Sequence, residues 1–110
     1  MLKVENTKIG SIDEIKLSGK LEVTNAVRLE VEFRNIFETN PVAIGLNLEN
    51  LRYIDSSGIS TILRCANLAK KAEIRFGVYN TPKETASVFN LSQVSDYINL
   101  TTKQEFLISN

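Results

Sequence analysis

The 110-residue sequence contains no histidine, no tryptophan and a single cysteine, Cys65. Without histidine, a Ser-His-Asp triad, a Cys-His pair and a histidine-based metal site are all excluded. One cysteine cannot form an internal disulfide, so the chain fits a reducing compartment. Because Cys65 falls in the middle of a helical apolar pattern, we interpret it as a small packing residue and not as a reactive thiol.

Charge of one sign and long apolar runs are also missing. Thirteen basic and thirteen acidic residues give a net charge of zero, so no bulk field attracts nucleic acid or an anionic membrane. No apolar run approaches the roughly 20 residues that span a bilayer, and residues 1–5 lack the apolar core of a signal peptide. We therefore expect a cytoplasmic protein with neither a nucleic-acid nor a membrane partner.

Glycine-rich phosphate-binding motifs are absent as well. Neither a Gly-x-x-x-x-Gly-Lys-Ser/Thr loop nor a Gly-x-Gly-x-x-Gly fingerprint occurs, and the carboxylates are scattered singly along the chain. We therefore expect a protein that is not an enzyme and that needs no metal or cofactor.

The chain has no linker, charge block or internal repeat, so we interpret residues 1–110 as one domain. Alternating apolar residues predict a hairpin over 2–17 and strands over 42–48, 74–78 and 97–100. Helical spacing and capping residues predict helices over 25–37, from about Ser57 to Lys71, from Thr81 past Phe89, and over 102–107. This order predicts an α/β fold with helices packed on a mixed, mostly parallel sheet that has an antiparallel edge.

The stretch from Leu46 to Ile59 carries the clearest functional signal. A strand with a polar end leads into Asp55-Ser56-Ser57-Gly58 and directly into an amphipathic helix. Backbone N–H groups and peptide dipoles at a helix N-terminus favour an anion. Serine is also a preferred helix cap, so Ser56 is either a simple cap or a site that takes a phosphate. A second strand-to-helix junction, residues 19–26, should converge on the same sheet edge.

The same stretch resembles the signature of the STAS domain, specifically that of single-domain anti-sigma factor antagonists. In that family a strand of the form x-Leu-Asp/Asn-Leu leads through a hydrophobic pair to Asp-Ser-Ser/Ala-Gly-Leu/Ile at the start of a helix. Here the corresponding residues are 46–48 and 55–59, and residues 19–22 (Gly-Lys-Leu-Glu) resemble a second block, Gly-x-Leu/Ile-Asp. The resemblance covers nearly the whole chain and implies a single STAS-like domain.

The resemblance implies that Ser56 is phosphorylated by a partner kinase that doubles as an anti-sigma factor. The unphosphorylated protein would bind this kinase, which then releases its sigma factor, and a serine phosphatase would reset the switch. Glu22 stands where the family usually has aspartate, a change that bears on partner choice. The residues expected at the partner surface are Glu22, Thr24, Asn25, Asp55, Ser56, Ser57, Gly58, Ser60, Thr61 and Arg64, the last three on the exposed side of the helix.

Two other interpretations stay open. A single STAS domain also serves as a structural or regulatory subunit of a lipid- or anion-transport assembly, or as a stressosome-like scaffold, where the serine need not be phosphorylated. Scaffold domains of the stressosome type usually depart from Asp-Ser-Ser-Gly. A small enzyme that uses Ser56 with Lys20 as its base is the other interpretation, and only the expected closeness of the two junctions supports it.

Overall fold

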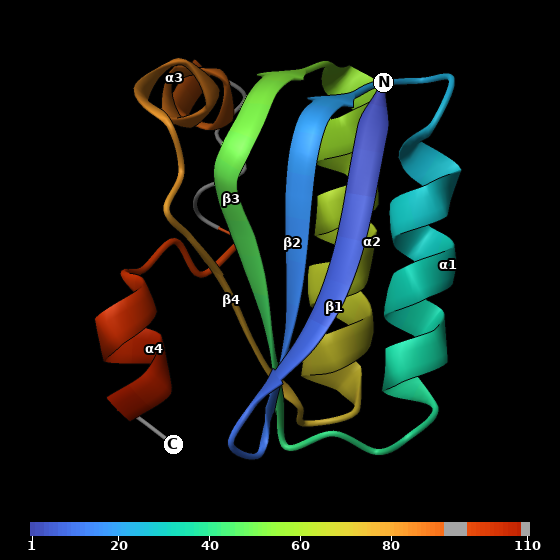
Figure 1. Ribbon diagram of the computed structural model, residues 1–110, viewed down its shortest axis with the longest axis vertical. Helices are drawn as coiled ribbons and strands as arrows, with labels where there is room; N and C mark the ends of the chain where they lie inside the picture. The colour runs from blue at the N-terminus through green and yellow to red at the C-terminus, as the bar shows by residue number, and fades with distance from the viewer. Residues whose placement is uncertain (92–96, 109–110) are drawn as a thin grey trace.

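The computed structural model describes residues 1–91 and 97–108. β1 (Leu2–Ile9) and β2 (Ile12–Leu21) form the predicted hairpin, whose turn passes through Gly10 at a φ of 62°. β2 is parallel to β3 (Ala43–Ile54), and β3 is parallel to β4 (Arg75–Tyr79), in the order β1-β2-β3-β4. The predicted α/β fold, with a mixed, mostly parallel sheet and an antiparallel edge, is therefore confirmed (Figure 1).

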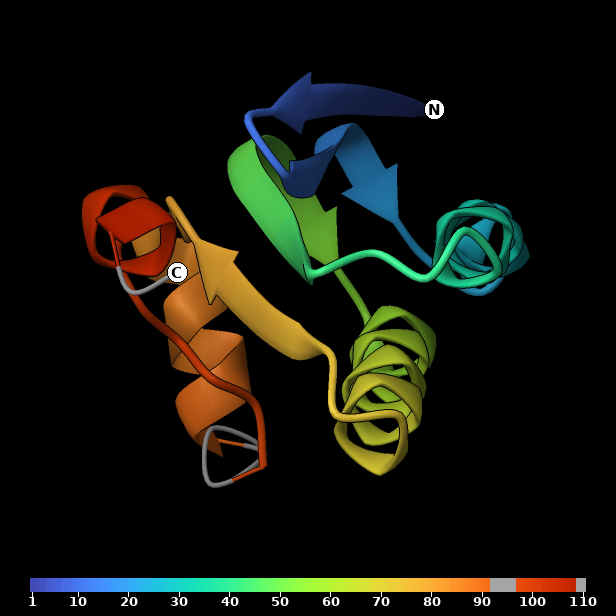
Figure 2. The ribbon, with the colours of Figure 1, turned by 90° about the horizontal axis from the view of Figure 1, so that it is seen from below.

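The helices lie on two sides of this sheet. α1 (Ala26–Phe37) and α2 (Ser56–Lys71) pack side by side on one face, whereas α3 (Lys83–Leu91) and α4 (Lys103–Ile108) lie on the other side of β4 (Figure 2). The main core fills the space between the sheet and the first two helices. A smaller cluster beneath α4 consists of Ile12, Ala43, Tyr79 and Phe106.

β3 is the central strand and is buried on both faces over its first half. Ile44 and Leu46 face the main core, while Gly45 faces the Tyr79 ring so closely that a Cβ there would lie 2.6 Å from the tyrosine hydroxyl. The strand was predicted to end near Leu48 but continues to Ile54, with two register shifts against β2. Its second half stays in the sheet because Leu51 and Ile54 are buried in the main core, while the polar side chains between them are exposed to solvent.

The predicted strand at 97–100 is wrong among the residues that the structure describes. Only a single bridge joins Leu100 to Val78, with backbone hydrogen bonds on either side of it. Ile98 turns into the main core, where 3% of it is exposed, and the chain enters α4 soon afterwards. The segment therefore covers the core with Ile98 and, in part, Leu100, and it makes a single bridge to β4 where a ladder was predicted.

The capping pattern predicted before the last helix is confirmed. The Glu105 N–H donates to Thr102 Oγ1 at 3.1 Å, and the Thr102 hydroxyl donates to Glu105 Oε1 at 3.1 Å. This reciprocal pair satisfies a backbone donor that the first turn of α4 would otherwise leave without a partner. It fixes the direction in which α4 leaves the preceding segment.

Candidate functional site

The carboxyl ends of β2 and β3 lie next to each other, so the two predicted junctions meet. Leu21 and Ile54 are register partners, and the Asp55 N–H donates to the Leu21 carbonyl at 3.2 Å. α2 begins directly after this point, and α1 begins after a short turn. The site is therefore built on two parallel strand ends and two helix starts.

Asp55 joins these two junctions. It is the N-cap of α2, and its Oδ1 accepts a hydrogen bond from the Gly58 N–H at 3.0 Å. Its Oδ2 accepts from the Val23 N–H, also at 3.0 Å, in the turn after β2. The interpretation of Ser56 as the cap is thus wrong, because the Asp55 side chain reaches the first free N–H groups and takes that role.

The turn after β2 is held by a second side chain. Asn25 Oδ1 accepts from the Glu22 N–H at 2.9 Å, and Asn25 Nδ2 donates to the Lys20 carbonyl at 3.0 Å. Asn25 occupies the N-cap position of α1, as predicted, but its side chain makes no capping bond to the helix. Because both ends of the amide bond the turn, the turn is fixed and presents Val23 and Thr24 to solvent.

Gly58 lets the first turn of α2 sit directly on the strand ends. A Cβ at this position would lie 2.7 Å from Ile54 Cγ1 and 2.9 Å from both Leu21 Cγ and the Leu21 carbonyl oxygen. Real side chains do not make such close contacts, so a larger residue would push the helix start away. The glycine therefore serves close packing of the helix start against the strand ends.

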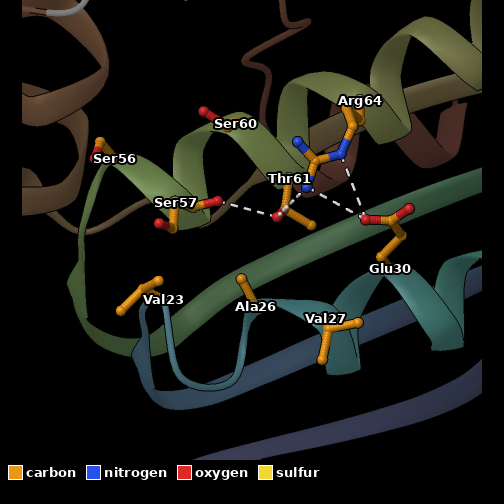
Figure 3. Close-up of a pocket in the computed structure, with 9 residues that line it drawn as sticks. All are labelled: Val23, Ala26, Val27, Glu30, Ser56, Ser57, Ser60, Thr61 and Arg64. Carbon is orange, nitrogen blue, oxygen red and sulfur yellow. Dashed lines mark hydrogen bonds and ion pairs between the residues drawn. The ribbon is translucent and has the colours of Figure 1, made fainter.

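A surface cavity of about 470 Å³ opens between the starts of α1 and α2 (Figure 3). It is lined from the α1 side by Val23, Ala26, Val27 and Glu30, and from α2 by Ser56, Ser57, Ser60, Thr61 and Arg64. At one end Arg64 Nη2 contacts Glu30 Oε1 at 3.3 Å and so links the two helices. At the Ser56 end, the bond from the Val23 N–H to Asp55 Oδ2 links the two helix starts.

The serines and the threonine of α2 differ in exposure and direction. Ser56 is the first residue of the helix and is exposed, whereas Ser57 is half-buried, and Figure 3 shows their side chains pointing in different directions. Thr61 was expected on the exposed side but is 1% exposed. Its hydroxyl donates to the Ser57 carbonyl at 3.0 Å and accepts from Arg64 Nη2 at 3.1 Å, which satisfies it inside the protein.

The comparison with family models matches the STAS domain over residues 3–106. The chain belongs to the STAS domain family. Its fold is similar to that of an anti-sigma factor antagonist from Mycobacterium paratuberculosis, with a TM-score of 0.90 and 18% identity over 99% of this chain and 93% of that chain. The comparison with curated proteins gives no match.

Two further solved structures share this STAS fold. The Bacillus cell fate determinant SpoIIAA in its phosphorylated form has a TM-score of 0.73 and 20% identity over 97% of this chain and 98% of that chain. A sulfate transporter family protein from Wolinella succinogenes has a TM-score of 0.76 and 11% identity over 94% of this chain and 93% of that chain. At such identities the likeness concerns the fold.

In this STAS domain the predicted partner residues fall into two groups. Ser56, Ser57, Ser60, Thr61 and Arg64 line the cavity. The other predicted residues, Glu22, Thr24, Asn25, Asp55 and Gly58, build or flank the two junctions and do not line it. Sequence reasoning missed Val23, Val27 and Glu30, although valines four residues apart on the outer side of a predicted helix were a readable signal.

The STAS site offers little to an enzymatic interpretation. Lys20 alternates with the buried Leu21 and so points to the other face of the sheet, and no lysine is among the described residues that line the cavity. Cys65 lies in the main core, where burial raises its pKa to about 12, as expected for a packing residue.

Residues 1–91 and 97–108 contain no group of three or more His, Cys, Asp or Glu side chains that could hold a metal ion. Within the same residues, the helices are too short or too polar to cross a membrane.

Proposed function

We propose that this STAS domain is an anti-sigma factor antagonist that works by partner switching in the cytoplasm. Its unphosphorylated form binds a serine-kinase anti-sigma factor, which releases its sigma factor, and phosphorylation of Ser56 ends the binding. A serine phosphatase then resets the protein. The position of Ser56 carries the proposal: the side chain is exposed, begins α2, follows the capping Asp55 and borders the cavity between α1 and α2.

The surroundings of Ser56 suit a reversible phosphate. A phosphoryl group adds roughly −1.5 to −2 charges at neutral pH, and the N-terminus of a 16-residue helix favours an anion. Both oxygens of Asp55 are bound to N–H groups, so this carboxylate stays fixed beside the phosphate. In a complex that excludes water, repulsion between these two anions is weakly screened and works against a partner fitted to the hydroxyl.

The neighbouring hydroxyls are poorer acceptors of a phosphate. Thr61 is buried, and Ser57 is half-buried with its carbonyl bonded to Thr61. Ser60 is exposed but lies one turn into α2, where the backbone N–H groups are bonded within the helix. Ser56 alone among the hydroxyls that line the cavity combines exposure with the first position of the helix.

Incubation with the purified cognate kinase and ATP, followed by phosphopeptide mapping, tests the assignment. Phosphate is expected on Ser56, and phosphate mainly on Ser57 or Ser60 would contradict the proposal. Calorimetric titration tests the charge mechanism. Ser56→Ala should bind the kinase persistently, whereas Ser56→Asp should lose about 2–5 kcal/mol of binding free energy because it buries an unpaired charge.

Purification of the protein from its native cell tests the alternative role in a transport assembly. Copurification with subunits of such an assembly, together with no binding to the kinase and no phosphorylation by it, would identify a structural subunit. If Ser56→Ala and Ser56→Asp bind the kinase with equal affinity, the protein is a ligand of the kinase, but charge at Ser56 does not control the binding.

A further inference from the structure

Three exposed valines form an apolar row on the outer side of α1, which we name the valine stripe: Val23, Val27 and Val31. They are 72%, 63% and 53% exposed, respectively. Val27 and Val31 are four residues apart and share one helix face, and Val23 lies in the turn just before the helix. The opposite side of α1 is buried in the main core.

Neither packing within the domain nor helix propensity accounts for the valine stripe. The outer face of a surface helix ordinarily carries charged and polar residues. Valine is also a weaker helix former than alanine, lysine or glutamate, because its branched side chain loses rotamer freedom. A row of exposed valines therefore points to a contact outside this chain.

The valine stripe is continuous with the surface around Ser56. Val23 and Val27 line the same cavity as Ser56, as Figure 3 shows. On the other side, Val27 and Val31 line a second hollow of about 310 Å³ that also includes Val4 of β1. The apolar surface therefore runs from the candidate phosphorylation site along the outer side of α1.

Two of the charged residues beside the valine stripe, Glu30 and Arg28, are already engaged. Glu30 contacts Arg34 at 3.4 Å and Arg64 at 3.3 Å. Arg28 donates to the Leu2 carbonyl. A strongly charged partner would gain little from these groups, so the valine stripe fits an apolar surface.

The size of a stable interface indicates that a kinase bound at Ser56 also contacts the valine stripe. A stable interface buries roughly 800 Å² on each partner, more than the few residues around Ser56 supply, and its core is depleted of charged residues. A kinase that seats Ser56 must therefore also cover neighbouring surface. We propose that the valine stripe is the apolar part of the docking surface for the serine-kinase anti-sigma factor. This inference rests on the proposed function, because it extends the contact area of the same partner.

The double variant Val27→Thr with Val31→Thr tests this directly. Threonine has nearly the shape and helix propensity of valine but carries a hydroxyl in place of one methyl group. The Kd for the purified kinase should rise about tenfold, as expected for the loss of two apolar contacts. The KM for phosphorylation of Ser56 should rise to a similar extent, and kcat should change less than KM because Ser56 and the capping Asp55 are unaltered.

Val42→Thr is the matched control. Val42 is 56% exposed and directly precedes β3, at the end of the sheet opposite to Ser56. Its Kd and KM should equal those of the unmodified protein. If the double variant unfolds at a lower temperature, Val27→Ala, which raises helix propensity, is measured in its place.

The outcomes separate the two proposals. If the unmodified protein neither binds the kinase nor is phosphorylated by it, the proposed function fails and the inference fails with it. If the unmodified protein binds but the double variant binds equally well, the inference is wrong and the proposed function stands. Sedimentation that finds a dimer of the unmodified protein and a monomer of the double variant would assign the valine stripe to a second copy and overturn the inference.

Discussion

Two carboxylates, Asp55 and Glu14, each join separate parts of the chain, but on different sides of the sheet and with different neighbours. Asp55 is half-buried and bonds two backbone N–H groups at the surface, which leaves the adjacent Ser56 exposed. Glu14 is 6% exposed, and its Oε2 accepts from the Tyr79 hydroxyl at 2.7 Å and from Asn47 Nδ2 at 3.2 Å. Asp55 positions the surface around Ser56, whereas Glu14 bonds only groups that stabilise the fold.

The charge state of Glu14 follows from its partners. Burial works to raise the pKa of this carboxyl, but hydrogen bonds from Tyr79, Lys103 and Asn47 outweigh burial and hold the pKa below its ordinary value. Burial and the bond to Glu14 in turn raise the pKa of Tyr79. Lys103, the first residue of α4, contacts Glu14 at 3.1 Å. The ionised Glu14 thus fastens α4 to the sheet.

The largest expected effect comes from removing Glu14. Glu14→Ala leaves the buried Tyr79 hydroxyl without its acceptor and Lys103 without its ion pair, so the free energy of unfolding should fall by about 3 kcal/mol. Urea unfolding measures this loss. Glu14, Asn47, Tyr79 and Lys103 together form what we name the Glu14 network. Affinity for the kinase should not change, because the Glu14 network lies on the face of the sheet away from α1 and α2.

Glu49→Ala is the control for this measurement. Glu49 also pairs with a lysine, Lys16, but at 3.7 Å and with 60% of its side chain exposed. Its loss should change stability by no more than about 0.5 kcal/mol. Equal losses for Glu14→Ala and Glu49→Ala would mean that burial does not distinguish the two carboxylates.

Removing Asp55 should have a smaller effect on stability and a clear effect on the site. Asp55→Ala loses a helix cap and the bond to the turn after β2, at a cost of about 1–2 kcal/mol in urea unfolding. Phosphorylation of Ser56 should also slow, because the turn at 22–25 is no longer tied to α2. Asp55→Asn retains one acceptor oxygen, so its stability and its phosphorylation rate should lie between those of Asp55→Ala and the unmodified protein. Slower phosphorylation in Glu14→Ala as well would contradict the contrast between the two carboxylates.

The two carboxylates also differ in what the sequence reveals. Asp55 and its partners lie at strand-to-helix junctions, and parallel strands bring such junctions to one edge, so the meeting of 19–26 with 55–58 was predictable. The partners of Glu14 are Asn47, Tyr79 and Lys103, which lie on three other elements. No spacing along the chain relates them, so the network was not predictable.

The fold was predictable wherever one face of a helix or strand is buried and the other is exposed to solvent. β1 and the helices α1 and α2 follow this rule, and their periodicity located them correctly. The rule fails where burial is mixed. In the second half of β3 the polar Glu49, Asn50 and Arg52 break the alternation, although this half still pairs with β2 as far as Ile54. Thr61 is polar yet buried, because its hydroxyl bonds the preceding turn.

Acid should act on the Glu14 network before it unfolds the protein. Because the pKa of Glu14 is lowered from 4.5, its contribution to stability is fully present above that pH and is lost as the pH falls through the lower folded value. Glu14→Gln keeps the shape without the titration, so its free energy of unfolding should fall less steeply below pH ~4.5. Urea unfolding between pH 7 and 3 gives both slopes, and equal slopes would show that Glu14 is not the group that titrates.

The smallest effect on stability is expected at Ser56, where Asp55 already supplies the cap. Ser56→Ala and Ser56→Asp should each change the free energy of unfolding by no more than about 0.5 kcal/mol. An anion at the helix start gains roughly 0.3–1 kcal/mol from the helix dipole, and repulsion from the nearby Asp55 is of similar size while both groups are solvated. The two contributions nearly cancel in the isolated domain, although not in a complex that excludes water.

Phosphorylation of Ser56 should therefore act locally and leave the fold intact. Asp55 bonds both the first turn of α2 and the Val23 N–H, so a phosphate beside it disturbs both segments that it joins. Backbone amide NMR shifts measured before and after phosphorylation should change mainly over residues 53–62 and 20–26. The Glu14 network holds α4 on the other side of the sheet, so shifts of its amide signals would indicate a conformational change that spreads beyond the site. Widespread shifts in the hairpin at 2–17 or in α4 would mean that the switch refolds the domain, and the contrast between a site carboxylate and a structural carboxylate would no longer hold.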